Sequence, residues 1–200
     1  HGARYSFTGE SCWDTAVQHG GKEMSFLNVY DADAAWRLVW SLGDGRPAAV
    51  VIKHANPCGV AVADDIETAY QRAHEGDPVS AFGGIVAVNR NVTHAMAEAL
   101  APVFTEVLIA PGFDADALLL LLEKRNLRVL EAGRPHTPAL DVRSVDGGLL
   151  VQTADSVTID RDAWQVVTER APTETEWADL ELAWKIAARV TSNTIVLVKD

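Results

Sequence analysis

The sequence comprises 200 residues, of which 48% are hydrophobic and 22% charged, with a formal net charge of −11. This length suits one domain or part of one, and the composition is that of an ordinary globular protein. The negative charge argues against nucleic-acid binding, which depends on clustered lysine and arginine. The longest apolar stretch, ending at Leu122, is too short to cross a membrane, and we expect no leader at the start of the chain. We therefore expect a cytoplasmic protein without membrane contact.

The first predicted element is a helix that follows Asn28, with Asp31 and Asp33 as its capping residues. Its apolar positions recur at the spacing of one helical face, at Trp36, Val39 and Trp40. A continuous apolar run at residues 48–52, rich in β-branched side chains, then predicts a strand buried on both faces. This run ends abruptly at Asn56-Pro57.

The same alternation continues along the next eighty residues. Further strands are predicted at residues 85–88, 107–109 and 127–130, and helices at 66–74, 93–100 and 114–124. Strands that alternate with helices indicate a mainly parallel sheet covered on both faces. The sequence therefore predicts an α/β fold of three layers.

The last third of the chain is less regular. Residues 134–161 form a proline-rich connection with extended segments around Leu149, Leu150 and Val151. Thr173 and Glu176 form a capping box that opens a helix. Four apolar residues are expected on its buried face: Trp177, Leu180, Trp184 and Ala188. A final strand is predicted at residues 195–198, and because domains seldom end at a buried strand, we expect the chain to be cut from a longer one.

Two cationic side chains, Lys53 and His54, follow the first buried strand. Ligands gather at the carboxyl ends of strands in open α/β sheets, so this place has the strongest claim to chemistry. A nearby ammonium disfavours the imidazolium, which leaves His54 able to accept a proton near neutral pH. The alternative is a histidine satisfied by backbone groups beside a lysine that reaches solvent.

Two other places could bind a ligand. The Gly83-Gly84 pair permits close approach of the backbone, although it is equally typical of a plain turn. Asn193 lies where the last helix gives way to the last strand, and it could be only a helix cap.

A zinc site is the competing chemistry. The sequence His54-Ala55-Asn56-Pro57-Cys58 is similar to the zinc deaminase signature, which needs H-x-E followed by P-C-x-x-C. Asn56 replaces the glutamate and the second cysteine is missing. Only Cys12 and Cys58 are present, without the spacing of a metal site, so we expect two free thiols and no bound metal.

Four segments together carry a resemblance to a known family. These segments are residues 31–36, 51–59 and 77–86 and the pair Ser192-Asn193. In order and spacing they resemble the bacterial bifunctional enzymes with phosphoribosylaminoimidazolecarboxamide formyltransferase and IMP cyclohydrolase activities. The resemblance covers essentially the whole chain and is weakest between Arg134 and Pro172.

The resemblance implies formyl transfer from 10-formyltetrahydrofolate to 5-aminoimidazole-4-carboxamide ribonucleotide (AICAR), without a catalytic metal. It implies that His54 is the base, that Lys53 steadies charge on the formyl oxygen, and that Asn193 orients the substrate. Gly83 and Glu106, which lies just before the predicted strand at 107–109, match positions that contact the ribonucleotide. A homodimer with shared sites is expected.

The resemblance also implies a cytidine-deaminase-like fold. It identifies residues 1–200 as part of the formyltransferase domain, the first deaminase-like unit, with the cyclohydrolase domain and second formyltransferase unit outside the chain. The chain alone is then expected to be inactive. The alternative from another class is a non-catalytic ligand-binding or assembly module that retains the fold. The catalytic interpretation predicts that Lys53, His54, Gly83 and Asn193 surround one crevice.

Overall fold

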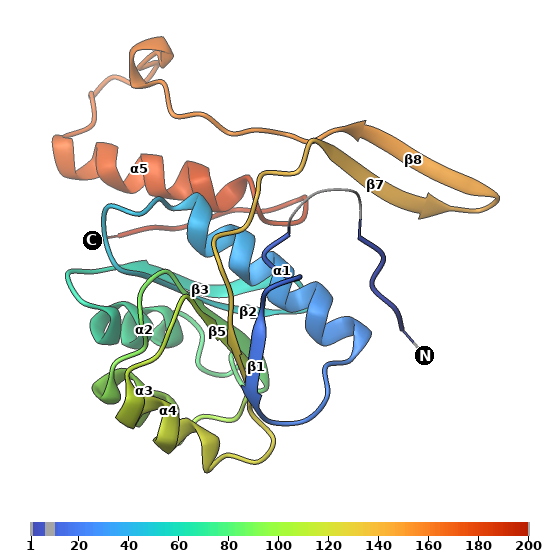
Figure 1. Ribbon diagram of the computed structural model, residues 1–200. Coiled ribbons are helices and arrows are strands. Elements are labelled where there is room, and N and C mark those ends of the chain that lie inside the picture. Colours follow the sequence, from blue (N-terminus) through green and yellow to red (C-terminus); the bar gives the residue numbers. More distant parts are fainter. Residues whose placement is uncertain (1, 7–10, 200) are drawn as a thin grey trace. The chain divides into compact units, whose positions relative to one another are not determined.

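The computed structural model describes residues 2–6 and 11–199, which form two compact units. Unit 1 comprises the described residues up to 135 together with residues 189–193, and unit 2 comprises residues 136–188 and 194–199. Among the described residues, a six-stranded sheet forms the centre of unit 1, and a two-stranded hairpin and one α-helix belong to unit 2 (Figure 1).

The sheet of unit 1 has the strand order β1-β6-β5-β4-β2-β3. Its strands are β1 (Val17–Gly20), β2 (Ala48–Lys53), β3 (Asn56–Val62), β4 (Gly84–Val88), β5 (Thr105–Ala110) and β6 (Arg128–Glu131). β4, β5 and β6 pair in parallel, β2 is antiparallel to β3 and β4, and β1 is antiparallel to β6. Strands β3 to β6 therefore share one direction, which makes the sheet mixed but mainly parallel.

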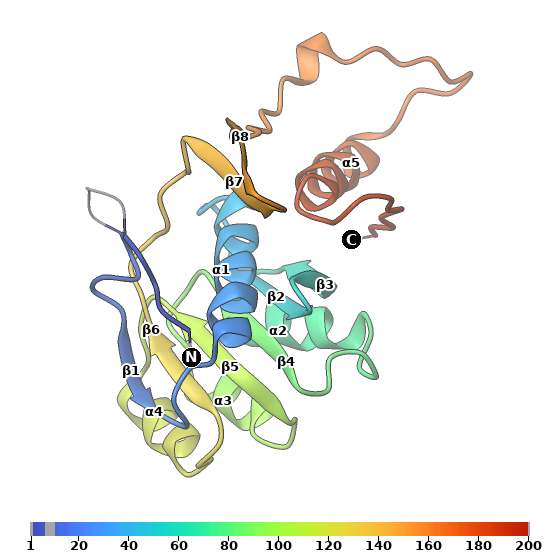
Figure 2. The ribbon, with the colours of Figure 1, turned by 90° about the vertical axis from the view of Figure 1, so that its right-hand side faces the viewer.

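Helices cover both faces of this sheet. α1 (Phe26–Ser41) packs on one face, and α2 (Ile66–Glu75), α3 (His94–Leu100) and α4 (Ala115–Leu122) pack on the other (Figure 2). The predicted three-layer α/β architecture is confirmed, and each predicted helix and strand between residues 48 and 130 is present within a few residues of its expected bounds.

Strand β2 contributes to both halves of the core. Ala48, Val50 and Ile52 pack in the layer of α1, whereas Ala49 and Val51 pack in the layer of α2, α3 and α4. All five are at most 1% exposed. Because successive side chains of a strand point to opposite faces, a continuous apolar run is what a doubly covered strand needs.

The start of α1 differs from the prediction. The helix begins at Phe26, and its N-cap is Ser25, whose hydroxyl accepts from the backbone N–H of Asn28 at 3.1 Å. Asn28 completes a capping box by accepting from the backbone N–H of Ser25. Asp31 and Asp33 lie inside the helix, so the prediction that they cap it is wrong. The reciprocal partner is an asparagine, whereas the usual capping box has Glu or Gln at that position.

Strand β3 is absent from the predicted elements, because Asn56-Pro57 indicated the end of a strand. It is an edge strand, and Pro57 lies opposite Ile52 where the register of the β2–β3 pair shifts. Edges and bulges are the two places in a sheet that tolerate proline, since the missing N–H is not required there. The chain therefore turns back after Lys53 into a hairpin.

Unit 2 begins with a second hairpin, formed by β7 (Leu140–Val145) and β8 (Gly148–Thr153). A short 3₁₀ turn (Arg161–Ala163) follows, and then α5 (Glu174–Ala187), which carries the predicted capping box of Thr173 and Glu176. The Trp164 ring packs against two rings of α5, with centroids 5.8 Å from Trp177 and 5.9 Å from Trp184. Aromatic packing of this kind stabilises a small unit beyond the area it buries.

Two expectations for this end of the chain are wrong. The face of α5 expected to be buried is largely open, with Leu180 45% and Trp184 53% exposed, and Ile186 is the buried residue of the helix. Residues 195–198 form no strand, and Ile195 and Leu197 are at least 90% exposed. Apolar periodicity indicates which face of a helix another layer would bury, but it does not supply that layer. A strand likewise needs a neighbouring strand to pair its backbone groups.

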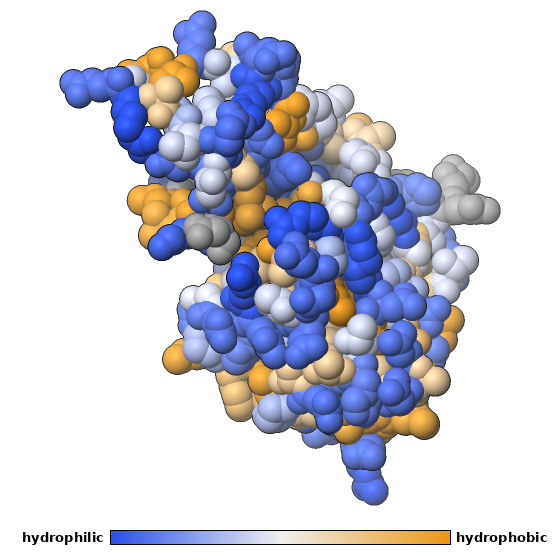
Figure 3. Space-filling model, turned by 90° about the vertical axis from the view of Figure 1, so that its left-hand side faces the viewer, coloured by the Kyte–Doolittle hydropathy of each residue, from blue (hydrophilic) through white to orange (hydrophobic). Residues whose placement is uncertain are grey.

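None of the described helices is both long and apolar enough to cross a membrane. The surface shown in Figure 3 is mostly hydrophilic in its lower part, at the level of α2, α3 and α4, and hydrophobic residues appear there in small separate patches.

A buried asparagine ties the start of β2 to the preceding loop. Asn89 is 2% exposed, and its Oδ1 accepts from the backbone N–H of Ala48 at 2.7 Å. Its Nδ2 donates to the carbonyls of Gly43 and Arg46, both at 3.0 Å. One side chain thus satisfies three backbone groups that the helix-to-strand connection would otherwise leave unpaired.

We expect Asn89→Ala to lower the free energy of unfolding by about 2–3 kcal/mol, because buried polar groups then lose their partners. Urea denaturation followed by circular dichroism measures this change. Asn91→Ala, at an exposed position two residues away, is the matched control and should shift stability by less than about 0.5 kcal/mol. Equal effects of the two substitutions would contradict the role given to Asn89.

Candidate functional site

The β2–β3 hairpin presents Lys53 and His54 at its turn. Lys53 is the last residue of β2, and the turn consists of His54 and Ala55, with φ of 55° and 59°. Two residues with positive φ are what a type I′ hairpin turn requires. Neither residue is glycine, and this conformation costs an L-amino acid roughly 1–2 kcal/mol. Such strain persists only where the surroundings hold it, and it concentrates at functional sites.

Asp31 of α1 lies against this turn. Its carboxylate is close enough for the charge of His54 and the backbone N–H groups of Ala55 and His54 to affect its pKa. Burial raises the pKa of Asp31 above its usual value, while His54 and the two N–H groups oppose the rise. The side chain expected to cap a helix thus lies inside that helix, near a turn that is distant in sequence.

The Lys53 side chain reaches the glycine loop before β4. Its Nζ donates to the carbonyl oxygen of Phe82 at 2.9 Å. Gly83 follows directly, with φ of 72°, and donates its N–H to the Phe104 carbonyl at 2.7 Å. The structure therefore brings Lys53 next to Gly83, and the positive φ gives a reason for glycine at that position.

Gly84 is required by close packing. A Cβ at this position would lie 2.7 Å from the carbonyl oxygen of Ile52 and 3.0 Å from that of Ala81. Both contacts are with backbone, which cannot move aside easily. The Gly83-Gly84 pair is therefore more than a loose turn, because it lets the start of β4 lie against the end of β2.

These residues gather at one edge of the sheet. Ile52 of β2 lies opposite Ile85 of β4, and Gly84 of β4 lies opposite Thr105 of β5. The end of β2 therefore adjoins the beginnings of β4 and β5. The expectation that the site lies at the carboxyl ends of strands holds for Lys53 and His54, which lie at the end of β2. It is wrong for Gly83 and Glu106, which lie at the amino ends of β4 and β5, because β2 runs antiparallel to β4.

Glu106 is the second residue of β5, where the sequence placed it just before the strand. Its Oε2 accepts from a guanidinium N–H of Arg128 at 2.5 Å. Arg128 is 8% exposed and also donates its Nε–H to the Glu23 carbonyl at 3.1 Å. A buried cation with these partners fixes the Glu106 carboxylate at the edge of the sheet.

Asn193 belongs to the short segment of residues 189–193 that returns to unit 1. The backbone N–H of Thr191 donates to Oδ1 of Asn56 at 3.0 Å, which connects this segment to the β2–β3 hairpin. The Asn193 side chain itself accepts from the Ser192 hydroxyl at 2.5 Å. The contact with the hairpin is thus made two residues before Asn193.

Cys58 lies close to Lys53 but is poorly suited to nucleophilic chemistry. Burial raises the pKa of its thiol, Asp77 adds to the rise, and Lys53 opposes it. A thiol with a raised pKa is protonated near neutral pH, and the thiolate is the reactive form. Within the part of the chain that is described, no three His, Cys, Asp or Glu side chains are grouped to hold a metal ion, and both cysteines are free.

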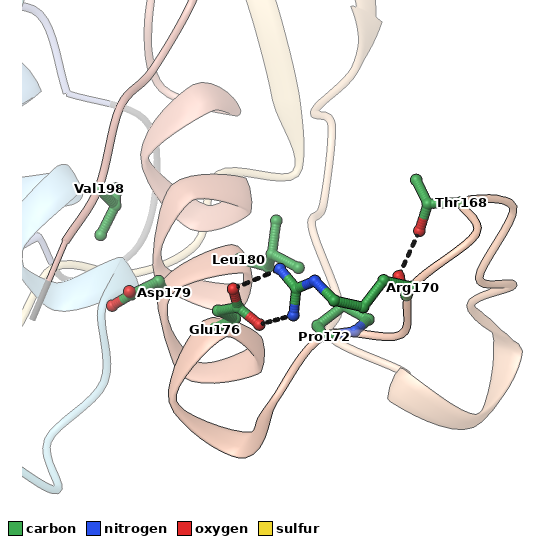
Figure 4. Close-up of a pocket in the computed structure, with 7 residues that line it drawn as sticks. All are labelled: Thr168, Arg170, Pro172, Glu176, Asp179, Leu180 and Val198. Carbon is green, nitrogen blue, oxygen red and sulfur yellow. Dashed lines mark hydrogen bonds and ion pairs between the residues drawn. The ribbon is translucent and has the colours of Figure 1, made fainter.

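A hollow of about 410 Å³ lies elsewhere, within unit 2 (Figure 4). Its polar wall is the ion pair between Arg170 and Glu176, with N–O distances of 2.8 and 2.7 Å. The hydrogen bond from Arg170 lowers the pKa of Glu176 to about 2, helped by Thr173. Because these two charges neutralise each other and none of the predicted site residues line the hollow, we place the candidate site at the sheet edge.

Sequence reasoning missed two side chains at this edge. Asp31 was interpreted as a helix cap, and Asn56 was considered only as a replacement for the deaminase glutamate. Asn56 accepts from the backbone N–H of Thr191, which is remote in sequence, and Asp31 lies near the His54–Ala55 turn. The only signal that could have pointed to Asp31 is a carboxylate in a helix that already has a cap at Ser25.

The strain at the turn can be measured. We expect Ala55→Gly to raise the free energy of unfolding by about 0.5–1 kcal/mol, because glycine adopts positive φ without the steric cost. Ala61→Gly, in the interior of β3, is the control and should lower stability by about 1 kcal/mol. Chemical denaturation of the two variants tests the pair, and destabilisation by both would show that Ala55 is not strained.

The whole chain, residues 1–200, matches a family model described as AICARFT/IMPCHase bienzyme. Relatives named bifunctional purine biosynthesis protein PurH are similar to it. The protein of Thermoanaerobacter sp. (strain X514) is 49% identical over 90% of this chain and 35% of the relative. The proteins of Roseobacter denitrificans and Dinoroseobacter shibae are 50% and 52% identical over 93% of this chain and 36% of each relative.

The chain thus spans about 35% of the length of the curated relatives it matches. A solved structure of Acinetobacter baumannii RibD covers 50% of the chain with a TM-score of 0.38 and 14% identity, which is too weak to support a conclusion. The match to the family model covers the whole of this chain and agrees with the resemblance carried by the four sequence segments. The chain belongs to the AICARFT/IMPCHase bienzyme family.

Proposed function

We propose that this chain supplies the Lys53–His54 pair for formyl transfer from 10-formyltetrahydrofolate to the amine of AICAR in the intact bienzyme. One observation carries the proposal: a strained two-residue turn at the sheet edge presents the exposed His54 directly after Lys53. The family supplies the reaction class, and the turn supplies side chains suited to it.

The chemistry needs a base, because an amine conjugated to an imidazole carboxamide is a poor nucleophile. As the amine nitrogen attacks the formyl carbon, His54 takes the proton that the amine loses. The bond from the formyl carbon to the folate nitrogen then breaks, and the folate nitrogen keeps the electron pair and takes up the proton from His54. Lys53 stabilises the negative charge that develops on the formyl oxygen. Its ammonium has three donors, and the Phe82 carbonyl occupies one of them.

We assign Gly83, Glu106 and Asn193 to binding of the ribonucleotide. Glu106 is held by Arg128, and an ionised carboxylate keeps lone pairs that can accept from sugar hydroxyls. Gly83 has a positive φ that residues with a side chain adopt only at a cost in free energy, and its missing side chain lets a ligand approach the backbone. Asn193 lies two residues from Thr191, which contacts the hairpin, and can reach a substrate held there. The reaction requires no metal ion.

We further propose that the 200 residues alone do not catalyse the transfer. They span about 35% of the relatives, and catalysis depends on holding both reactants in near-attack geometry. The intact enzyme is proposed to be a cytoplasmic homodimer whose deaminase-like units complete the pockets for nucleotide and folate.

The catalytic roles can be tested in the intact bienzyme. His54→Ala and Lys53→Ala should each lower turnover by roughly a hundredfold or more, the usual scale for a general base and for oxyanion stabilisation. Cys58→Ala should change turnover little, because no step uses its thiol. Initial rates of formyl transfer at saturating substrate concentrations measure the effect of each of the three substitutions. Near-normal rates in both His54→Ala and Lys53→Ala would refute the mechanism.

The incomplete site makes its own prediction. The isolated chain should show no measurable formyl transfer, even at a protein concentration at which the intact bienzyme gives the maximal assay signal. A folded chain, verified by circular dichroism, that still turned over would contradict the proposal that residues outside it complete the site.

A further inference from the structure

Arg128 is a buried cation at the edge of the sheet, and the proposed mechanism gives it no part. At 8% exposure it is more buried than any other charged residue that the structure describes. We propose that Arg128 is a positioning residue, which holds the Glu106 carboxylate where it accepts hydrogen bonds from the ribose hydroxyls of the nucleotide. This inference rests on the proposed function, which assigns Glu106 to the ribonucleotide.

Arg128 lies next to Glu106 because β5 and β6 run in parallel. It is the first residue of β6 and lies opposite Val107 of β5, so Glu106 is one residue away along the neighbouring strand. Its Nη1 donates to Oε2 of Glu106 at 2.5 Å and to the carbonyl oxygen of Glu106 at 3.4 Å. The guanidinium thus contacts both the backbone and the carboxylate of Glu106, which limits the orientations open to that side chain.

The guanidinium is held from its other side by the loop between β1 and α1. Its Nε donates to the Glu23 carbonyl oxygen at 3.1 Å. Gly21 has a φ of 92°, and a Cβ there would collide with the Leu127 carbonyl and lie 2.7 Å from the Cα of Arg128. Because the loop packs this closely on the start of β6, the Glu23 carbonyl is a fixed acceptor for the guanidinium.

The ion pair is buried at one end and open at the other. The side chain of Arg128 is 10% exposed, whereas that of Glu106 is 35% exposed. A buried charge is costly unless it is paired and hydrogen-bonded, and the Glu106 carboxylate and the Glu23 carbonyl supply these partners. An ionised carboxylate has about four acceptor positions, so the contact with Arg128 leaves the exposed part of Glu106 able to accept from a ligand.

Glu106 adjoins the end of the sheet that carries the proposed catalytic pair. Two residues before it, the Phe104 carbonyl accepts from the N–H of Gly83. The preceding carbonyl in that loop, at Phe82, accepts from Lys53. A sugar bound between Gly83 and Glu106 therefore lies beside the groups proposed to react.

The chemistry of AICAR selects the hydroxyls as the partners of Glu106. An ionised carboxylate accepts hydrogen bonds and repels the phosphate. The amine and the carboxamide are neighbours on the imidazole ring, and the amine must reach His54. The ribose hydroxyls are the donors that remain, and two adjacent hydroxyls suit the acceptors of one carboxylate. A carboxylate that Arg128 holds in one orientation loses less conformational freedom on binding than a freely rotating one.

The test uses the intact bienzyme and compares Arg128→Met, Arg128→Lys and Glu106→Ala. Arg37→Met is the matched control, because Arg37 is a partly buried arginine that also pairs with a carboxylate, that of Asp33 at 2.6 Å on α1. Circular dichroism verifies that the variants are folded. The measurements are kcat, the KM of AICAR and of 10-formyltetrahydrofolate, and kcat/KM for the 2′-deoxy and 3′-deoxy analogues of AICAR.

We expect the unaltered enzyme to prefer AICAR over at least one deoxy analogue by about tenfold or more, the scale of one hydrogen bond to a charged group. In Arg128→Met the KM of AICAR should rise about tenfold and most of this preference should be lost, as in Glu106→Ala. The kcat and the KM of the folate should change little, because a contact made equally in the ground and transition states affects KM alone. Arg128→Lys keeps the charge without the fork of donors, so its values should be intermediate. Arg37→Met should behave like the unaltered enzyme.

A purely structural role of Arg128 predicts a different pattern. A general disturbance of the fold would lower kcat or raise both KM values together, while the preference over the deoxy analogues stayed intact. That pattern in folded Arg128 variants, or no change at all, would overturn the role of Arg128. If Arg128→Met does not fold, Arg128→Lys decides between the same outcomes.

The readouts also separate this inference from the proposed function. Lack of any preference in the unaltered enzyme, or a preference that survives Glu106→Ala, would refute the assignment of Glu106 to the ribose and the inference with it. A preference lost in Glu106→Ala but kept in both Arg128 variants would overturn the role of Arg128 alone. The transfer mechanism is tested separately by His54→Ala, whose result does not depend on Arg128.

Discussion

The antiparallel pairing of β2 with β4 is the constraint on which the site depends. It places the end of β2 beside the start of β4, so that Lys53 reaches the Phe82 carbonyl across the edge of the sheet. The register is fixed because alternate residues of β2 belong to opposite core layers, and a slip of one residue would exchange them. The missing side chain at Gly84 permits the approach, since a Cβ there would collide with backbone of β2.

The hairpin tip combines backbone strain with external support. His54 and Ala55 occupy a conformation that favours glycine, and the backbone N–H of Thr191 donates to Asn56 of the same hairpin. Glu106 is held in a similar way by the buried Arg128. Side chains proposed to act on substrate are thus positioned by contacts with rigid elements, which is the condition for electrostatic preorganisation.

In unit 2, the sequence pattern predicts where the helix begins but not which of its residues are buried. The capping box of α5 forms as its sequence predicts, because both partners lie within four residues of each other. Its apolar face stays largely exposed, and residues 195–198 form no strand despite their apolar and largely β-branched composition. Local signals specify a helix and its start, whereas burial depends on a second layer that no local signal supplies.

The sequence by itself determined the doubly buried strands, the helices between them and the stretch that carries Lys53 and His54, because apolar periodicity and a continuous motif are local properties. It also determined the family, through four segments in a fixed order. Only the tertiary structure decided that β3 folds back on β2, that β2 opposes β4, and that Asp31 lies inside α1 and does not cap it. Strand direction and the partner of a polar side chain are set by contacts between residues distant in the chain, and the pattern of one segment carries no record of them.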